Sequence, residues 1–326
     1  MKKIIQQKEF GIALVVILIS ILLTSLSPAF LTLENILDIL KANSVLGILA
    51  IGMTLIVITG GIDVSVAAVT AAVTVVIGKL AVSLGSNGYS LWIIFIVALL
   101  AGAAFGFING ILIAKTQIPP IVASLGTMSI ISGLTLYVTN GNYVNSSMLP
   151  KAFIQFSDFK VGGVSILIII FLLVAIFTWF LLRYLNVGRD ILSFGGNPVS
   201  SMRVGINSTK VQLFVYTYMG LLAGIAGIVQ TAYNKGVDPN GFSGFEMMVI
   251  AAVVLGGSNI SGGSGSILGT VLGVLLLGIM QNGLILARIN TFWQDVFVGL
   301  IIILAVSYEV IKRRREEAGL AKVEVE

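Results

Sequence analysis

The chain has 326 residues and a formal net charge of +5, and 57% of its residues are hydrophobic while only 10% are charged. A soluble domain usually carries about 25% charged residues, so this composition excludes a water-facing surface around most of the chain and indicates a membrane protein. The sequence contains no cysteine and no histidine, which excludes disulfide bonds, Cys/His metal sites, thiol nucleophiles and imidazole catalysis.

Ten apolar runs follow one another along the chain. A bilayer core of about 30 Å needs roughly 20 apolar residues per helix, and the first run, 10–30, is too long for the apolar core of a cleaved signal peptide, which is the competing interpretation. The other runs lie near 43–60, 64–84, 91–114, 118–138, 163–184, 210–232, 245–257, 264–287 and 292–311. We expect an all-α integral membrane protein of about ten transmembrane helices, some short or broken by glycine, forming a single transmembrane permease domain over 1–326.

The positions of the Lys and Arg residues predict the orientation. With the N-terminus inside and ten crossings, thirteen of the nineteen fall inside, namely Lys2, Lys3, Lys8, Lys115, Arg183, Arg189, Arg203, Lys210, Lys312, Arg313, Arg314, Arg315 and Lys322. The six outside are Lys41, Lys79, Lys151, Lys160, Lys235 and Arg288. Because cytoplasmic segments carry the Lys/Arg excess, we expect cytoplasmic tails at about 1–9 and 312–326 and a cytoplasmic loop at about 186–209, in the cell membrane. The basic residues then face the lipid bilayer and not nucleic acid.

Asp63 is the most informative charge because it lies between two apolar runs, directly after Gly60-Gly61. A carboxylate at the bilayer centre costs about 2.5–3.5 kcal/mol, so it should face a cavity, a partner or a break in a helix. It could line a solute path, or it could cap the next helix together with Ser65, and the two roles are compatible. The polar residues that we assign to a candidate substrate pathway are Asp63, Ser65, Asn109, Thr127, Asn259 and Asn282. For Asn109 and Asn282, a hydrogen bond between helices is the alternative.

The predicted cytoplasmic loop contains a short helix signal. Gly195-Gly196-Asn197-Pro198 predicts a turn in which Gly196 needs a positive φ. Valine at this position would strain the turn and change the direction of the loop. Asn197 should cap a helix with Pro198 in its first turn, and Gly205 should end it. The helix would either dock a partner or lie on the lipid surface as a connector.

The stretch 256–269 reads GGSNISGGSGSILG and is dense in Gly and Ser. It lacks the lysine of a phosphate-binding loop, whereas small residues allow helices to approach closely and irregular backbone to line a cavity. We therefore expect no nucleotide site, cofactor, metal site or catalytic residue. GGSNIS at 256–261 also echoes GGIDVS at 60–65, and NGLILAR at 282–288 echoes NGILIAK at 109–115. These echoes indicate an internal repeat or chance similarity in a biased composition.

Four segments in order carry a resemblance to a known family: 59–66 (TGGIDVSV), 118–128 (IPPIVASLGTM), the loop positions Gly188-Arg189, 195–198 and Gly205-Ile206, and 251–266 (AAVVLGGSNISGGSGS). The chain resembles, over about residues 40–310, the permeases of ribose-type ATP-binding-cassette importers, a group shared with branched-chain amino-acid permeases. It departs from their pattern at Ala67, where Gly is frequent, at Ser200-Ser201, where Ala-Ala is usual, and at Ala123-Ser124. The last departure could bear on the substrate.

The resemblance implies an importer in which two permease copies form a path at their interface. A cytoplasmic ATP-binding-cassette ATPase would dock on the coupling loop, and an extracytoplasmic binding protein would deliver a simple sugar. The coupling residues implied are Arg189, Gly195, Gly196, Asn197, Pro198, Arg203 and Gly205. The alternative is an ion-coupled secondary transporter of a small polar solute, for which Asp63 is the only deep acidic candidate.

Overall fold

The structure is a computed structural model that describes residues 8–85 and 90–288, and beyond them only residues 293, 296, 299, 300, 303 and 307. This part of the chain is almost entirely α-helical, with two short 3-10 helices and one two-stranded antiparallel hairpin. In chain order the elements are α2 (Lys8–Leu26), η1 (Pro28–Leu31), α3 (Leu33–Ala42), α4 (Ser44–Ile58), α5 (Val66–Leu84), α6 (Ser90–Ala114), α7 (Pro120–Thr139), η2 (Ser146–Met148), α8 (Lys151–Asp158), β1 (Lys160–Val161), β2 (Val164–Ser165), α9 (Ile166–Tyr184), α10 (Asn186–Gly196), α11 (Pro198–Arg203), α12 (Ser208–Asn234), α13 (Phe245–Leu255) and α14 (Ile267–Leu286).

The predicted all-α membrane fold is confirmed. Nine of the ten apolar runs coincide with α2, α4, α5, α6, α7, α9, α12, α13 and α14, and most of the run 292–311 lies outside the described residues. Within the described part, six helices are long and apolar enough to cross a membrane, or seven if α3 and α4, bent by 51° at their junction, form one span. The apolar parts of α2 and α13 are shorter, so a count of ten crossings stays a prediction.

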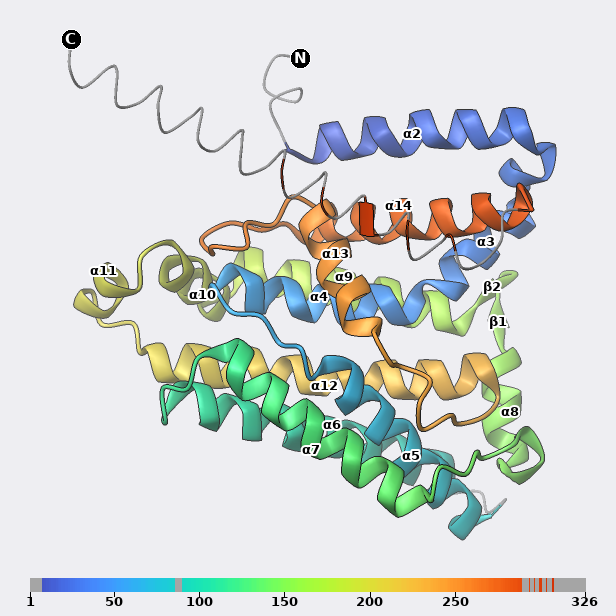
Figure 1. The fold of residues 1–326 in the computed structure, drawn as a ribbon, viewed down its shortest axis with the longest axis horizontal. Coiled ribbons are helices and arrows are strands. Elements are labelled where there is room, and N and C mark those ends of the chain that lie inside the picture. Colours follow the sequence, from blue (N-terminus) through green and yellow to red (C-terminus); the bar gives the residue numbers. More distant parts are fainter. Residues whose placement is uncertain are drawn as a thin grey trace.

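The long helices lie roughly lengthwise and give the molecule two distinct ends (Figure 1). Helices α10 and α11 project at one end, which we call the α11 end. The β1–β2 hairpin and α8 lie at the opposite end, which we call the hairpin end. The predicted inside and outside loops therefore separate in space, as the assumed alternation of crossings requires.

The described Lys and Arg residues divide evenly between the two ends. Those predicted to be inside are Lys8, Lys115, Arg183, Arg189, Arg203 and Lys210, and those predicted to be outside are Lys41, Lys79, Lys151, Lys160, Lys235 and Arg288. The excess that predicts the orientation thus comes from the tail residues, which lie outside the described part. The orientation stays a prediction for this reason.

Helix α4 forms the centre of the core, and all fifteen of its residues are buried. Helix α12 packs on α4, α5 and α6, and glycines on α6 and α12 bring these two helices close together. A Cβ atom added to Gly106 would collide with the Tyr216 carbonyl and lie 2.8 Å from the Cα of Gly220. In lipid, where burial of apolar surface does not drive helix association, this close small-residue packing is a main source of helix contact.

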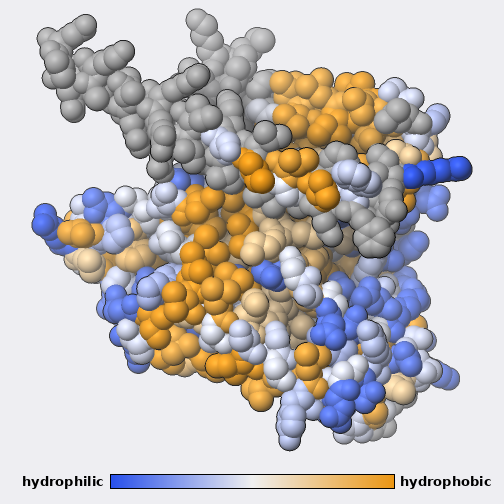
Figure 2. Space-filling model, in the orientation of Figure 1, coloured by the Kyte–Doolittle hydropathy of each residue, from blue (hydrophilic) through white to orange (hydrophobic). Residues whose placement is uncertain are grey.

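The outer surface is apolar around the middle of the molecule and more polar towards its two ends (Figure 2). Large apolar side chains on α2, α6 and α9 are exposed, for example Leu18 at 56%, Leu100 at 64% and Phe177 at 56%. Such a continuous exposed apolar surface would be insoluble in water, but it matches the hydrocarbon core of a bilayer.

Candidate functional site

The first feature of the candidate site is the break between α4 and α5, at residues 59–65. Helix α4 ends because Gly60 adopts a left-handed conformation (φ +78°), and the N–H of Gly61 donates to the Ile56 carbonyl at 3.0 Å. This is the usual arrangement of a glycine that ends a helix. The chain then runs without helical structure until Val66, so the break predicted at Gly60-Gly61 is present.

Asp63 stabilises the backbone directly before α5. Its Oδ1 atom accepts hydrogen bonds from the backbone N–H of Ser65 at 2.9 Å and from the Ser65 hydroxyl at 2.6 Å. The Asn109 amide on α6 donates in turn to Ser65 Oγ at 2.8 Å. Asp63 thus closes a turn at Ser65, directly before α5, but no side chain caps the N–H groups of α5 itself, so the expected capping role is seen only as this turn. Asp63 is only 3% exposed within this single chain.

Helix α7 covers the same break. Ser124 Oγ accepts a hydrogen bond from the Val64 N–H at 3.1 Å, and Thr127 donates to the Ser124 carbonyl at 3.1 Å. The structure thus places Asp63, Ser65, Asn109 and Thr127 in one neighbourhood. Sequence reasoning did not assign Ser124 to this group, although Ala123-Ser124 had stood out as a departure from the family pattern.

Two buried polar atoms near this break have no hydrogen-bond partner within the described part of the chain: Asn109 Oδ1 and Tyr216 Oη. Both residues are 1% exposed. A Cβ atom added to Gly61 would lie 2.6 Å from the Tyr216 hydroxyl, so this hydroxyl reaches the backbone of the break. Because buried polar groups are rarely left unpaired, these two atoms leave hydrogen-bonding capacity unused beside the break. Tyr216 lies in an apolar run, where sequence alone gave no signal for it.

The second break, at residues 256–266 between α13 and α14, is built in the same way. Gly257 is left-handed (φ +78°), and the Ser258 N–H donates to the Val253 carbonyl at 3.2 Å. Asn259 Oδ1 accepts from the Ser261 N–H at 3.0 Å, just as Asp63 accepts from Ser65. The two segments GGIDVS and GGSNIS therefore form similar breaks, with the left-handed glycine shifted by one position, which favours the repeat over chance.

Asn282 does not join the other pathway candidates. Its side chain lies on α14 towards the hairpin end and exchanges two hydrogen bonds with Asn35 of α3, at 2.9 and 3.0 Å. This is the hydrogen bond between helices that was its alternative role. Asn109 and Asn282, the first residues of the second echo, lie towards opposite ends of the molecule.

The loop at 186–209 forms two helices where one was expected. The prediction of a turn at Gly195-Gly196 is wrong, because α10 continues to Gly196 and the chain turns at Asn197. Gly196 is helical, and the positive φ expected there belongs to Gly205 (φ +92°). A Gly-Gly pair is typical of turns, which is why the sequence predicted one here. Gly195 instead lies inside a helix, where the absence of a side chain lets the backbone of Ile58 and Gly263 come close.

The predicted caps of α11 are confirmed. Asn197 Oδ1 accepts a hydrogen bond from the Ser200 N–H at 2.9 Å, Pro198 opens the helix, and Gly205 follows its end. Arg189 on α10 donates to the Asn186 side chain, while Arg203 lies exposed in the last turn of α11. The exposed apolar side chains on this unit are Val199 (56%), Met202 (49%) and Val204 (78%). Helix α11 therefore presents a mixed apolar and basic surface at the tip of the molecule (Figure 1).

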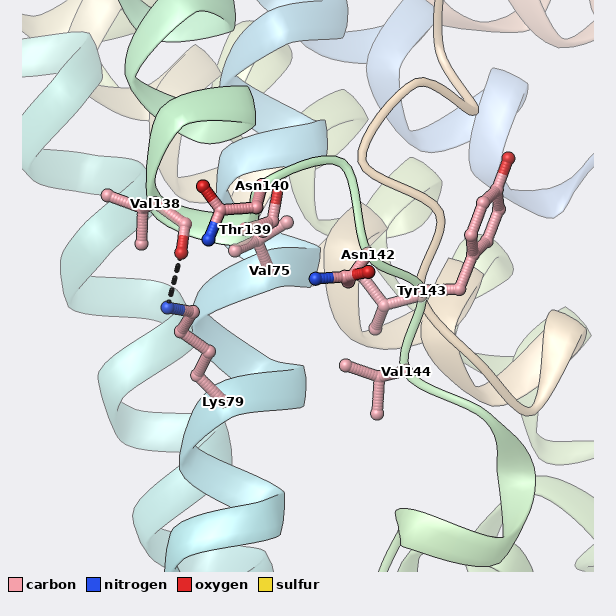
Figure 3. Close-up of a pocket in the computed structure, with 9 residues that line it drawn as sticks. Val75, Lys79, Val138, Thr139, Asn140, Asn142, Tyr143 and Val144 are labelled. Carbon is pink, nitrogen blue, oxygen red and sulfur yellow. Dashed lines mark hydrogen bonds between the residues drawn. The ribbon is translucent and has the colours of Figure 1, made fainter.

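A separate pocket of about 290 Å³ opens at the hairpin end, between α5, α7 and the loop after α7. Lys79 donates to the Val138 carbonyl at 2.7 Å, and Asn140, Asn142 and Tyr143 are among the other lining residues (Figure 3). None of the predicted pathway residues lines this pocket. It is therefore distinct from the two breaks.

Comparison with known proteins agrees with this geometry. A family model described as a branched-chain amino acid transport system / permease component matches residues 35–306. The chain is 36% identical to a ribose import permease protein of Escherichia coli strain K12, with 93% of each chain covered. It is 34% identical to a D-allose transport system permease protein of the same strain, covering 92% of this chain and 91% of the relative. It is 35% identical to an autoinducer 2 import system permease protein of Escherichia coli O9:H4, covering 95% and 89%. No solved structure matches the chain. This multi-pass membrane protein belongs to the family of branched-chain amino acid transport system permease components.

Proposed function

We propose that the chain is the membrane-spanning permease subunit of an ATP-binding-cassette importer, and that it translocates a monosaccharide such as ribose. Three relatives that align over nearly their whole length are import or transport permeases, and two of them carry ribose or D-allose in their names. ATP hydrolysis takes place on a separate subunit. Both termini and the α11 end face the cytoplasm, and the hairpin end faces outside.

The observation that carries the proposal is the construction of α11. Its start is fixed by the Asn197 cap and its end by the left-handed Gly205, so a helix of only six residues has a defined direction. Isolated helices this short are unstable in water, so the caps and the packing of α10 must hold it in place. A pre-shaped helix with exposed Val199 and Met202 beside Arg203 suits a groove with an apolar floor and acidic rim, which the ATPase would provide.

The remaining partners are a second permease copy and an extracytoplasmic sugar-binding protein. The second copy would form the path at its interface with this chain. No observation favours the ion-coupled alternative. Oδ1 of Asp63 accepts two hydrogen bonds from Ser65, which supports a structural role at the start of α5.

The test is sugar uptake into proteoliposomes that contain this chain with the ATPase and binding protein of the same transport system. We expect ribose uptake that requires ATP and stops when the ATPase carries a substitution that prevents hydrolysis. Uptake of the same size driven by an imposed proton or sodium gradient without ATP would refute the proposal.

A further inference from the structure

Three stretches of backbone meet at the α11 end with no side chain between them. The carbonyl oxygen of Ile58, the last residue of α4, accepts a hydrogen bond from the Gly263 N–H at 2.9 Å. Gly195 of α10 lies against the same peptide group. A Cβ atom there would lie 2.8 Å from the Ile58 carbonyl carbon and 3.0 Å from the Gly263 nitrogen, and it would collide with the Ile58 oxygen. We call the contact between Gly195, Ile58 and Gly263 the glycine junction.

The glycines of the second break close the junction from the other side. Gly262 and Gly263 are both left-handed, with φ of +91° and +82°. A Cβ atom on Gly262 would lie 3.1 Å from the Gly195 oxygen and 3.1 Å from the Gly60 nitrogen. These neighbours are backbone atoms, which cannot rotate away as the end of a side chain can. The junction therefore joins α10 directly to both helix breaks.

Helix α10 is seated at two points on one face. Gly188 and Gly195 are seven residues apart, which is about two helical turns, so they face the same side. A Cβ atom on Gly188 would lie 2.5 Å from the Cα of Leu182 on α9. Ile191 and Phe194 are buried between the two contacts. Helix α10 is thus held between α9 and α4 by backbone contacts at both ends.

The junction is linked to α11 on one side and to the breaks on the other. Asn197 ends α10 and caps α11, so the direction of α11 follows that of α10. On the other side, Asn259 Nδ2 donates to the Gly262 carbonyl at 2.8 Å and holds the second loop in shape. Gly60 lies only three residues before Asp63. A displacement of α10 is therefore transmitted to both breaks.

We propose that Gly195 is a positioning residue of the transport cycle, through which the α10–α11 unit sets the position of both helix breaks when the ATPase moves α11. The proposal rests on the proposed function, because it takes α11 as the ATPase-docking helix. It goes further by assigning a mechanical link that depends on the absence of a side chain at one position.

The first experiment compares Gly195→Ala with Gly133→Ala. Gly133 is also helical, on α7, and a Cβ atom there would meet nothing within 4 Å, so it controls for the change in helix propensity. Gly195→Ala leaves the exposed side chains of α11 unchanged, so copurification with the ATPase is measured first to verify that the complex has assembled. Ribose-stimulated ATP hydrolysis with the binding protein should fall at least tenfold relative to the Gly133→Ala complex. Equal stimulation in the two variants would overturn the proposal.

The second experiment remains decisive if Gly195→Ala fails to assemble. The chain has no cysteine, so Gly196→Cys with Ser264→Cys introduces two thiols on exposed residues beside the junction. A disulfide-forming crosslinker should stop ribose-stimulated hydrolysis, and dithiothreitol should restore it, whereas a merely misfolded protein would not recover. Each single variant is treated in the same way as a control. A crosslink without effect on hydrolysis, or a pair that does not crosslink in any nucleotide state, would overturn the proposal.

Different results would refute the proposed function and the role of the glycine junction. A wild-type complex that neither binds the ATPase nor responds to ribose would defeat the proposed function itself. A wild-type complex that couples normally, with variants that couple equally well, would defeat only the glycine junction.

Discussion

Asp63 is the residue at which a capping role and a charge-dependent role predict different results. Asp63→Ala removes the acceptor for the Ser65 N–H, 2.9 Å away, and for the Ser65 hydroxyl, 2.6 Å away. A buried donor left without a partner costs about 1–3 kcal/mol. Because the hydroxyl can rotate towards another acceptor while the N–H cannot, only the N–H loses its partner, and we expect Asp63→Ala to destabilise the chain by about 1–3 kcal/mol.

Asp63→Asn is the matched control because it keeps an oxygen at the capping position. Hydrogen bonds to a neutral acceptor are roughly half as strong as those to a charged one, which destabilises the variant. Removing a buried charge also removes its desolvation cost, which acts in the opposite direction. We therefore expect Asp63→Asn to stay within about 1 kcal/mol of the wild type and to keep most ATP-dependent uptake.

The stability of both variants is measured by titrating mixed micelles with sodium dodecyl sulfate and following helix content by circular dichroism. Uptake is measured with the assembled complex in proteoliposomes. If Asp63→Asn assembles normally but transports no sugar, the charge itself is required and the capping argument is insufficient. Equal destabilisation by asparagine and alanine would show that the oxygen acceptor is not what matters.

Three further predictions concern topology and packing. Asn197→Cys should react with an impermeant thiol reagent only from the cytoplasmic side and Lys160→Cys only from outside, and the reverse labelling would invert the topology. Asn282→Ala should cost about 0.6–2 kcal/mol by breaking the reciprocal bonds to Asn35, and a double-mutant cycle with Asn35→Ala should show coupling of that size, whereas additive losses would contradict it. Gly106→Val should abolish the yield of monodisperse protein because its side chain collides with the α12 backbone, while Gly133→Val, at an open position, should express normally; equal yields would refute the packing argument.

Hydrophobic runs predicted the helices well because length and polarity alone decide which segments can lie in lipid. The two breaks were also visible, since glycine pairs followed by Asp63-Val64-Ser65 or Asn259-Ile260-Ser261 combine a helix stop with a side chain that accepts the N–H two positions further on. The cap of α11 at Asn197 was predictable for the same reason. In each case the hydrogen bonds join residues within five positions of one another, so the local sequence contains both partners.

The features that the sequence did not predict depend on contacts between distant segments. Gly195-Gly196 has the local signature of a turn, yet Gly195 is small because Ile58 and Gly263 approach it from other parts of the chain. Ser124 and Tyr216 were not predicted to lie near Asp63 for the same reason. They follow Asp63 by 61 and 153 positions in the sequence, and α7 and α12 bring them to it. A local pattern can identify a glycine, but only the packing shows whether the glycine bends the backbone or lets another backbone come close.

These two uses of glycine together explain how the fold tolerates two irregular segments. Non-helical backbone at membrane depth is stable only where protein covers its polar groups or where it lines a water-filled cavity. The first break is covered by α6 and α7 through Asn109 and Ser124, and the second is fastened to α4 through the Gly263 N–H and the Ile58 carbonyl. Both breaks reach the glycine junction, next to the helix that we assign to ATPase docking. A small displacement of α10 there changes hydrogen bonds that the breaks need for their stability, so motion at α11 has a direct physical route to the irregular backbone.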